Sequence, residues 1–170
     1  MKKIIIIAAG LIGFTVSANA QATATATASA TIVTPITINK DVDLNFGNVA
    51  VSALNAGTVV MTPGGVRSAT LGVTLPAVAG SPAAASFTVS GESGYTYAIT
   101  LPTTPLTITS GSNTMTVDNF VSNPSGTGTL SVGATATQTL QVGATLNVAA
   151  GQAAGTYQSQ TPFDVTVNYN

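Results

Sequence analysis

The chain has 170 residues, of which nine are charged, and it contains no cysteine, histidine or tryptophan. With a formal net charge of −1, it lacks the basic surface that binds nucleic acid or anionic lipid through charge. Disulfide bonds are also excluded, so stability has to come from a hydrophobic core or from association with other chains.

The first 20 residues have the pattern of a secretory signal peptide. Met1, Lys2 and Lys3 form a positive start, residues 4–16 are apolar, and Ala18-Asn19-Ala20 matches an A-x-A cleavage site. The apolar run is shorter than the ~20 residues that cross a bilayer, so we expect cleavage after Ala20 and a mature chain without a membrane span. The remaining 150 residues suit one domain. Their two basic and five acidic side chains are few for a free monomer, and such a composition is typical of subunits of extracellular assemblies.

Small apolar side chains alternate with hydroxyl side chains over residues 21–38. Alanine occupies each even position from 22 to 30, isoleucine follows in the same phase at 32, 36 and 38, and threonine or serine occupies each odd position from 23 to 31. A period of two predicts a half-buried β-strand, here longer than the ~5–6 residues of an average strand. Such a strand either runs along its own sheet or leaves the domain to complete another one. Pro35 lacks an N–H and is expected at an edge, at a bulge or where the chain enters its own domain.

From residue 39 onward, short alternations between turn residues predict roughly nine to eleven β-strands and no helix. Residues 39–41 are expected to form a turn, and residues 91–94 to close a hairpin between strands at 84–89 and 95–101. Further strands are expected at 42–46, 58–62, 66–75 (with a bulge at Gly72), 106–109, 113–121, 130–132, 137–142, 145–148 and 163–169. The pattern predicts an all-β fold: an antiparallel immunoglobulin-like β-sandwich over residues 39–170, with residues 21–38 as a long N-terminal strand extension.

Catalysis needs a side chain that exchanges protons or attacks near neutral pH, and few candidates remain without histidine and cysteine. Asp41 and Asp43 are close enough to share a strand face and raise one another's pKa, but two solvent-facing carboxylates are the better interpretation. With Asn45 they have the spacing that opens a calcium loop, without the glycine and glutamate that complete it. Arg67 is expected to brace a loop against a carboxylate such as Asp118. We therefore expect no enzyme activity, no cofactor and no metal.

Three tyrosines support a binding-module hypothesis. Tyr95, Tyr97 and Tyr157 would form a platform for stacking sugars if they shared one exposed face. More often, such tyrosines bury the ring and satisfy the hydroxyl locally. Tyr157 follows a glycine ahead of the final strand, which is the position of a corner tyrosine in a Greek-key sandwich.

Short motifs spread over nearly all of residues 39–170 carry a family resemblance. They lie at 44–47, 57–60, 67–68, 72–73, 87–89, 97–102, 115–117, 140–146, 155–157 and 165–169. In this order they resemble a numbered domain-of-unknown-function family of secreted Gram-negative β-proteins, similar in layout to spore-coat-U-like and archaic chaperone–usher pilin subunits.

The resemblance implies a fimbrial subunit whose sandwich lacks one strand, which the N-terminal segment of a neighbouring copy supplies. The donor backbone would pair with an open sheet edge and its alternate side chains would enter a groove. The implied assembly residues are Ala26, Ala28, Ala30, Ile32, Ile36 and Ile38 of the donor, and Phe163, Val165, Val167 and Tyr169 of the last strand. The implied partners are other copies of the chain, with a periplasmic chaperone and an outer-membrane usher left open. The implied location is the periplasm in transit, then the cell surface or the medium.

The sequence leaves two interpretations that make different structural predictions. A polymerising subunit requires residues 21 to about 34 to be unpaired in a single copy, together with an open sheet edge. A stand-alone secreted binding module or adhesin requires the same segment to pair within its own sandwich, with an exposed aromatic patch. A hydrolase would need an acid pair in a cleft, for which the chain offers little.

Overall fold

The structure, a computed structural model, describes residues 21–170, so the predicted signal peptide lies outside the described residues. Residues 33–170 fold as one unit, separate from the residues that precede them. Residues 21–36 enter no strand, and the side chains of residues 21–32 are exposed. Within residues 21–170 there is no helix that could cross a membrane.

The described residues contain thirteen β-strands. These are β1 (Thr37–Val42), β2 (Ala50–Val51), β3 (Gly57–Met61), β4 (Arg67–Leu71), β5 (Val73–Thr74), β6 (Ala85–Ser90), β7 (Thr96–Thr100), β8 (Leu106–Ser110), β9 (Asn113–Asn123), β10 (Thr127–Thr129), β11 (Thr137–Val148), β12 (Gln158–Ser159) and β13 (Thr166–Tyr169).

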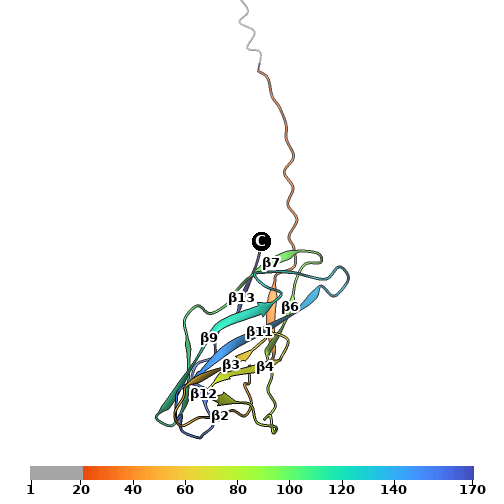
Figure 1. Cartoon of the computed structure of the whole chain (residues 1–170). Helices are drawn as coiled ribbons and strands as arrows, with labels where there is room; N and C mark the ends of the chain where they lie inside the picture. Colours follow the sequence, from red (N-terminus) through yellow and green to blue (C-terminus); the bar gives the residue numbers. More distant parts are fainter. Residues whose placement is uncertain (1–20) are drawn as a thin grey trace, which may run out of the picture. The chain divides into compact units, whose positions relative to one another are not determined.

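The long strand β11 organises the largest sheet. Its first half pairs with β6, its second half pairs with β3, and β9 pairs along its other side. The sheet runs in the order β1-β6-β11-β9-β8-β12, and β4 extends it beyond β3. A second sheet has the order β10-β7-β13, and β2 pairs with β5. In Figure 1, β7 and β13 lie at the end of the domain that holds the C-terminus, and β2 and β12 lie at the other end. All pairings are antiparallel, which confirms the predicted β-sandwich.

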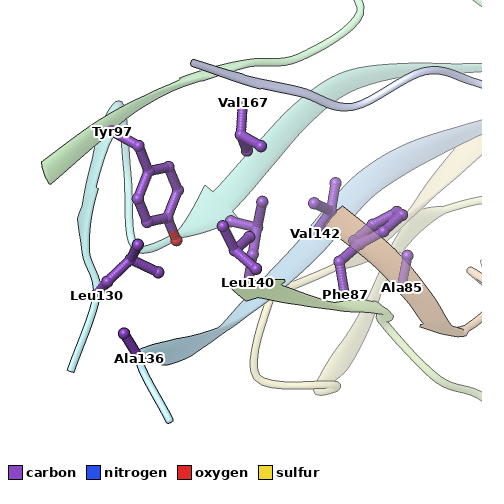
Figure 2. Packing of buried hydrophobic residues seen from close by; sticks show 9 residues of the cluster. Ala85, Phe87, Tyr97, Leu130, Ala136, Leu140, Val142 and Val167 are labelled. Atoms are coloured by element: carbon purple, nitrogen blue, oxygen red, sulfur yellow. The ribbon is translucent and has the colours of Figure 1, made fainter. Parts of the chain in front are cut away.

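Two clusters of buried apolar side chains form the core. The first cluster connects β6 and β11 to β7 and β13, and consists of Ala85, Phe87, Val89, Tyr97, Leu130, Ala136, Leu140, Val142 and Val167. Figure 2 shows Tyr97 pointing inward toward Leu130 and Leu140, while Val167 points inward from the neighbouring strand. The second cluster lies around the other half of β11 and consists of Val59, Val73, Val117, Ala144, Leu146 and Val148. Both arise from period-two alternation, because even-numbered residues of β11 are buried along its whole length from Leu140.

Tyr97 is the largest side chain of the first cluster, and it is fully buried. Its hydroxyl donates a hydrogen bond to Oε1 of Gln138 at 2.8 Å, and the same oxygen accepts the N–H of Thr129 at 2.7 Å. The ring lies directly over Gly128, where any Cβ would collide with the phenol. Burial raises the pKa of the Tyr97 hydroxyl above its ordinary value.

Several local predictions were wrong because they relied on neighbouring residues alone. The expected turn at 39–41 lies inside β1, and the expected strand at 42–46 shrinks to the end of β1 and one bridge between Asn45 and Ala83. The expected hairpin does not form, because β6 and β7 belong to different sheets and residues 91–94 cross between them. Residues 127–129, which none of the expected strands includes, form β10. The strands expected at 137–142 and 145–148 are one strand, continuous through Gly143, where a Cβ would collide with the carbonyl of Met61.

A β-bulge in β9 explains the position of Phe120. Val121 lies opposite Gly143, but Asp118 lies opposite Thr145, so β9 carries one extra residue between these pairs. Asn119 has a positive φ of 48° at this point. The extra residue reverses the alternation, so that Val117 and Phe120 both face the core while Val121 faces solvent.

Candidate functional site

The strands β1 and β13 are edge strands that lie close together in space. Within residues 21–170, β1 pairs only with β6 and β13 pairs only with β7. The first residue of β1 pairs with the end of β6, and the last residue of β13 pairs near the start of β7, so both lie at the same end of the domain. The two strands therefore run in opposite directions, and each leaves a row of backbone N–H and C=O groups without a strand partner.

Half-buried apolar side chains line these two edges. Ile36, Ile38, Phe163, Val165 and Tyr169 are partly buried and pack against the first core cluster. Val167, on the same face of β13 as Tyr169, is buried. The ring of Phe163 packs against that of Phe120 with centroids 5.0 Å apart. The apolar side chains along the two edges are thus only partly covered, although the cluster beneath them is buried.

The residues predicted to act in assembly separate into two groups. Phe163, Val165, Val167 and Tyr169 all face the first core cluster of their own domain, as do Ile36 and Ile38. In contrast, Ala26, Ala28, Ala30 and Ile32 belong to the exposed segment that enters no strand. Ile32 is 97% exposed, although it is among the most hydrophobic side chains of the chain.

A ring of hydrogen bonds holds Thr34, two residues ahead of Ile36. The Thr34 N–H donates to Oε2 of Glu92 at 2.8 Å, and the Tyr169 hydroxyl donates to the Thr34 carbonyl at 2.8 Å. The Glu92 N–H donates to the Tyr169 hydroxyl at 2.6 Å and closes the ring. We call these three residues the Thr34 ring. Both backbone polar groups of Thr34 are thereby satisfied by the domain.

Two neighbours support the Thr34 ring. The ring of Tyr95 packs edge-on against that of Tyr169, with centroids 5.6 Å apart and an interplanar angle of 64°. Gly91 has no side chain, and a Cβ there would collide with the Tyr169 hydroxyl. The backbone hydrogen bond from Thr34 is the main cause of a pKa of Glu92 below its ordinary value, since it stabilises the carboxylate.

The remaining charged candidates have structural partners. Asp41 accepts a hydrogen bond from the Thr88 hydroxyl, and Asp43 forms an exposed ion pair with Lys40 at 2.6 Å. Among residues 21–170, no group of three or more histidine, cysteine, aspartate or glutamate side chains is placed to hold a metal ion. Arg67 does brace a loop, but its partners are the carbonyls of Phe46 and Asn48 rather than Asp118. The prediction for Arg67 was therefore right in role and wrong in partner.

The three tyrosines do not form one platform. Tyr97 is fully buried, Tyr95 is 46% exposed and packs against Tyr169, and Tyr157 lies ahead of β12. The Tyr157 hydroxyl donates to the carbonyl of Ala153 at 2.8 Å and accepts from Nε2 of Gln152 at 2.8 Å. A hydroxyl bonded to backbone a few residues upstream is the contact expected of a corner tyrosine.

Two open surface hollows lie away from the edges of β1. One, of about 480 Å³, is lined mainly by β3, β9 and the end of β11. The other, of about 670 Å³, lies between the segment 100–107 and the segment 160–166. The single ionisable group in its lining is Asp164, so neither hollow offers the pair of groups that acid–base chemistry uses.

The Thr34 ring could not be found from the sequence. Its residues are separated by 58, 77 and 135 positions, and no local motif links them to one another. The one available signal was Gly91, since a glycine beside a predicted strand indicates a close approach of another group.

No curated protein and no solved structure matches this chain. A family model matches residues 36–169, which begin two residues after Thr34 and end at the last residue of β13. This agrees with the resemblance of the short motifs to a domain-of-unknown-function family. The chain therefore belongs to the family described as Domain of unknown function (DUF4402).

Proposed function

We propose that this protein is a structural subunit that polymerises into surface filaments by donor-strand complementation. In this proposal residues 21–33 of one copy insert between β1 and β13 of the next copy. The observation that carries the proposal is the pair of neighbouring, singly paired edges, lined by apolar side chains that are only partly buried. An inserted strand satisfies both rows of backbone groups and covers the apolar side chains between them.

The alternation of the N-terminal segment fits such a gap. In an extended donor, the alanine face points to the core and the hydroxyl face points to solvent. Small side chains suit this position, because Ile38, Val165 and Tyr169 already pack against the first cluster beneath it. Ile32 has the largest apolar area on the inward face and would contribute the most per residue.

The polarity of insertion determines the shape of the assembly. If the donor segment runs antiparallel to β13, its C-terminal end lies beside the start of β13, at the end of the acceptor that is opposite to the acceptor's own Thr34. The folded domain of the donor copy then lies beyond the start of the acceptor's β13, and copies add head to tail. A donor parallel to β13 would bring two equivalent ends together and close a dimer. Contacts that do not close on themselves generate filaments, so the proposal includes antiparallel insertion.

The length of the segment is sufficient for this arrangement. Thirteen extended residues span about 43 Å at ~3.3 Å per residue. The seven residues from Phe163 to Tyr169 span about 23 Å on the same basis. Roughly half of the segment would lie between the two edges, and the rest would connect neighbouring bodies.

The proposal extends to the route of assembly. The predicted signal peptide would export each subunit, and the filament would end on the cell surface or in the medium. Before a neighbour is available, the two open edges need temporary cover, because exposed edges aggregate. The family resemblance suggests two partners that would fit this need: a periplasmic chaperone that lends a strand and an outer-membrane usher that exchanges it.

The first experiment deletes residues 21–33 from the full chain and compares assembly by size exclusion and negative-stain microscopy. We expect filaments or SDS-resistant ladders from the full chain, and folded monomers from the deletion variant that bind a peptide of residues 21–33.

A matched pair of substitutions separates the two faces of the donor. Ala28→Asp places a charge on the inward face and is expected to abolish assembly, since an unpaired charge in an apolar groove is costly. Thr27→Asp places the same charge on the outward face and should leave assembly intact. Equal assembly by both variants, or a folded full-length monomer that never assembles, would reject the proposal.

A further inference from the structure

A donor segment attached to an acceptor groove faces a competitor, namely its own domain. Residues 21–33 are joined through Thr34 to β1, the strand whose free edge they would pair with in another copy. An intramolecular strand has an effective concentration of about 1 mM for a short connection. That is roughly a hundredfold above subunits at ~10 µM, so self-insertion would suppress polymerisation unless something prevents it.

Self-insertion requires the chain to reverse its direction ahead of β1. The tightest reversal is a two-residue hairpin with β1, with the turn at residues 33–36. Tight two-residue hairpins use type I′ or II′ turns, and type I′ needs positive φ at both central residues. The central residues here are Thr34 and Pro35. Pro35 has φ fixed near −65°, and a residue before proline is held in an extended conformation.

The Thr34 ring also opposes this turn, because residues of the folded domain hold the backbone of Thr34. The N–H and C=O of Thr34 are bound to Glu92 and to Tyr169 respectively, so the orientation of both peptide groups of this residue is fixed. The Tyr169 hydroxyl that does this is itself held by the Glu92 N–H and by packing against Tyr95. Turning the chain back at Thr34 would break two of these hydrogen bonds.

We infer that the Thr34 ring and Pro35 together prevent the extension from completing its own sheet, and so reserve residues 21–33 for a second copy. Glu92 and Tyr169 are positioning residues: within one copy they act on the extension through Thr34. The ring also marks the division within the alternating segment. Ile36 and Ile38, after it, pack in their own core, whereas Ala26 to Ile32, before it, are exposed. This inference rests on the proposed function.

The decisive variant builds the missing turn. Thr34→Asn with Pro35→Gly, in the full chain, introduces the Asn-Gly pair that type I′ hairpins prefer. We expect a monomer in which the amides of residues 22–33 exchange at least about tenfold more slowly than in the wild-type monomer, because they now pair with β1. The filament yield should fall by about tenfold or more.

Variants of the Thr34 ring test it without altering the turn residues. Tyr169→Phe removes the hydroxyl that donates to the Thr34 carbonyl but keeps the aromatic ring that packs on Tyr95. Glu92→Ala removes the carboxylate that accepts the Thr34 N–H. Both should lower the filament yield several-fold and slow exchange at residues 22–33 of the monomer. Glu92→Gln retains an oxygen that accepts the Thr34 N–H and should restore assembly. Melting temperatures of all variants establish that folding is preserved.

The outcomes separate this inference from the proposed function. If the wild type assembles through residues 21–33 but the Asn-Gly variant assembles equally well with unprotected amides, the inference is overturned and the proposed function stands. If the wild type never assembles, the proposed function fails. Slower exchange in the Asn-Gly monomer would even then support the block on self-insertion, and unchanged exchange would refute it.

Discussion

The two halves of the domain differ in how their strands are paired rather than in how well their centres are packed. Leu140 in the first cluster and Leu146 in the second are both buried. Around the second cluster, β3 and β9 each pair on both sides, and the singly paired strands β4 and β5 follow one another directly in the chain. The first cluster is bounded by β1 and β13, which each have one partner in the described chain. A core can therefore be filled at its centre while the hydrogen-bonded sheet around it remains incomplete.

The largest expected effect comes from deleting a core side chain in each half. Leu140→Ala and Leu146→Ala should each reduce the free energy of unfolding by about 2–5 kcal/mol, measured by denaturant titration. Only Leu140→Ala should also weaken binding of a peptide of residues 21–33, because its cavity lies under the open edges. Equal loss of peptide affinity in both variants would place the peptide elsewhere.

A smaller effect is expected at Gly128, which leaves room for the aromatic ring of Tyr97 because it has no side chain. In Gly128→Ala the new Cβ would collide with the buried phenol, which should cost about 1–3 kcal/mol of stability through forced displacement of the ring. Gly64→Ala is the matched control, since the nearest atom to its Cβ, Oγ1 of Thr62, lies 3.9 Å away. It should change stability by less than ~0.5 kcal/mol. A neutral Gly128→Ala would mean that Tyr97 does not need its present position.

Tyr97→Phe should cost about 1 kcal/mol near neutral pH, because the hydrogen bond to Gln138 is lost. The raised pKa of the Tyr97 hydroxyl adds a pH dependence. Its stabilising contribution is complete below the pKa of an unfolded tyrosine, ~10, and is lost as the pH rises toward the folded value. Alkaline unfolding followed by circular dichroism should therefore be shifted to higher pH in Tyr97→Phe, whereas an unshifted curve would assign the transition to other groups.

The smallest effect concerns the charge in the Thr34 ring. The pKa of Glu92 is lowered, so its contribution to the folded state is present above the ordinary glutamate pKa of ~4.3 and is lost as the pH falls through the lowered value. The amide resonance of Thr34 should shift with a midpoint below ~4.3 in an NMR titration and should not titrate in Glu92→Gln. A midpoint at or above that value would contradict the hydrogen bond.

The fold could be predicted from the sequence wherever it depends only on the alternation of apolar and polar residues along one strand. Residues 84–89 and 163–169 show their apolar faces in the sequence, and in the structure these side chains are buried in the first cluster or pack against it. Pairing was not predictable, because it is decided by residues far apart. Gly91 and Gly94 suggest a hairpin, but the loop that contains them crosses between two sheets. The charged pair Lys40 and Asp41 suggests a turn, but an edge strand such as β1 keeps polar side chains exposed.

The candidate site was predictable only in part for the same reason. The alternation of residues 21–38 could not reveal that the segment divides at Thr34, since the division depends on Glu92 and Tyr169. The extra residue at Asn119, which turns Phe120 toward Phe163, also has no signature in its neighbours. What the sequence did contain was the chemistry of each face, because side-chain type and strand period are local properties.

The antiparallel ladder between β1 and β6 has a mechanical consequence. The chain enters β1 at the end that the Thr34 ring holds, so a pull on residues 21–33 directed along β1 loads the hydrogen bonds of the ladder simultaneously, in shear. Opening a ladder in shear requires all its bonds to yield at once, whereas peeling breaks them in succession. β6 passes the load to β11, which extends through both core clusters. The strand arrangement that leaves one edge of β1 unpaired also gives the domain a tension-bearing path through its largest sheet.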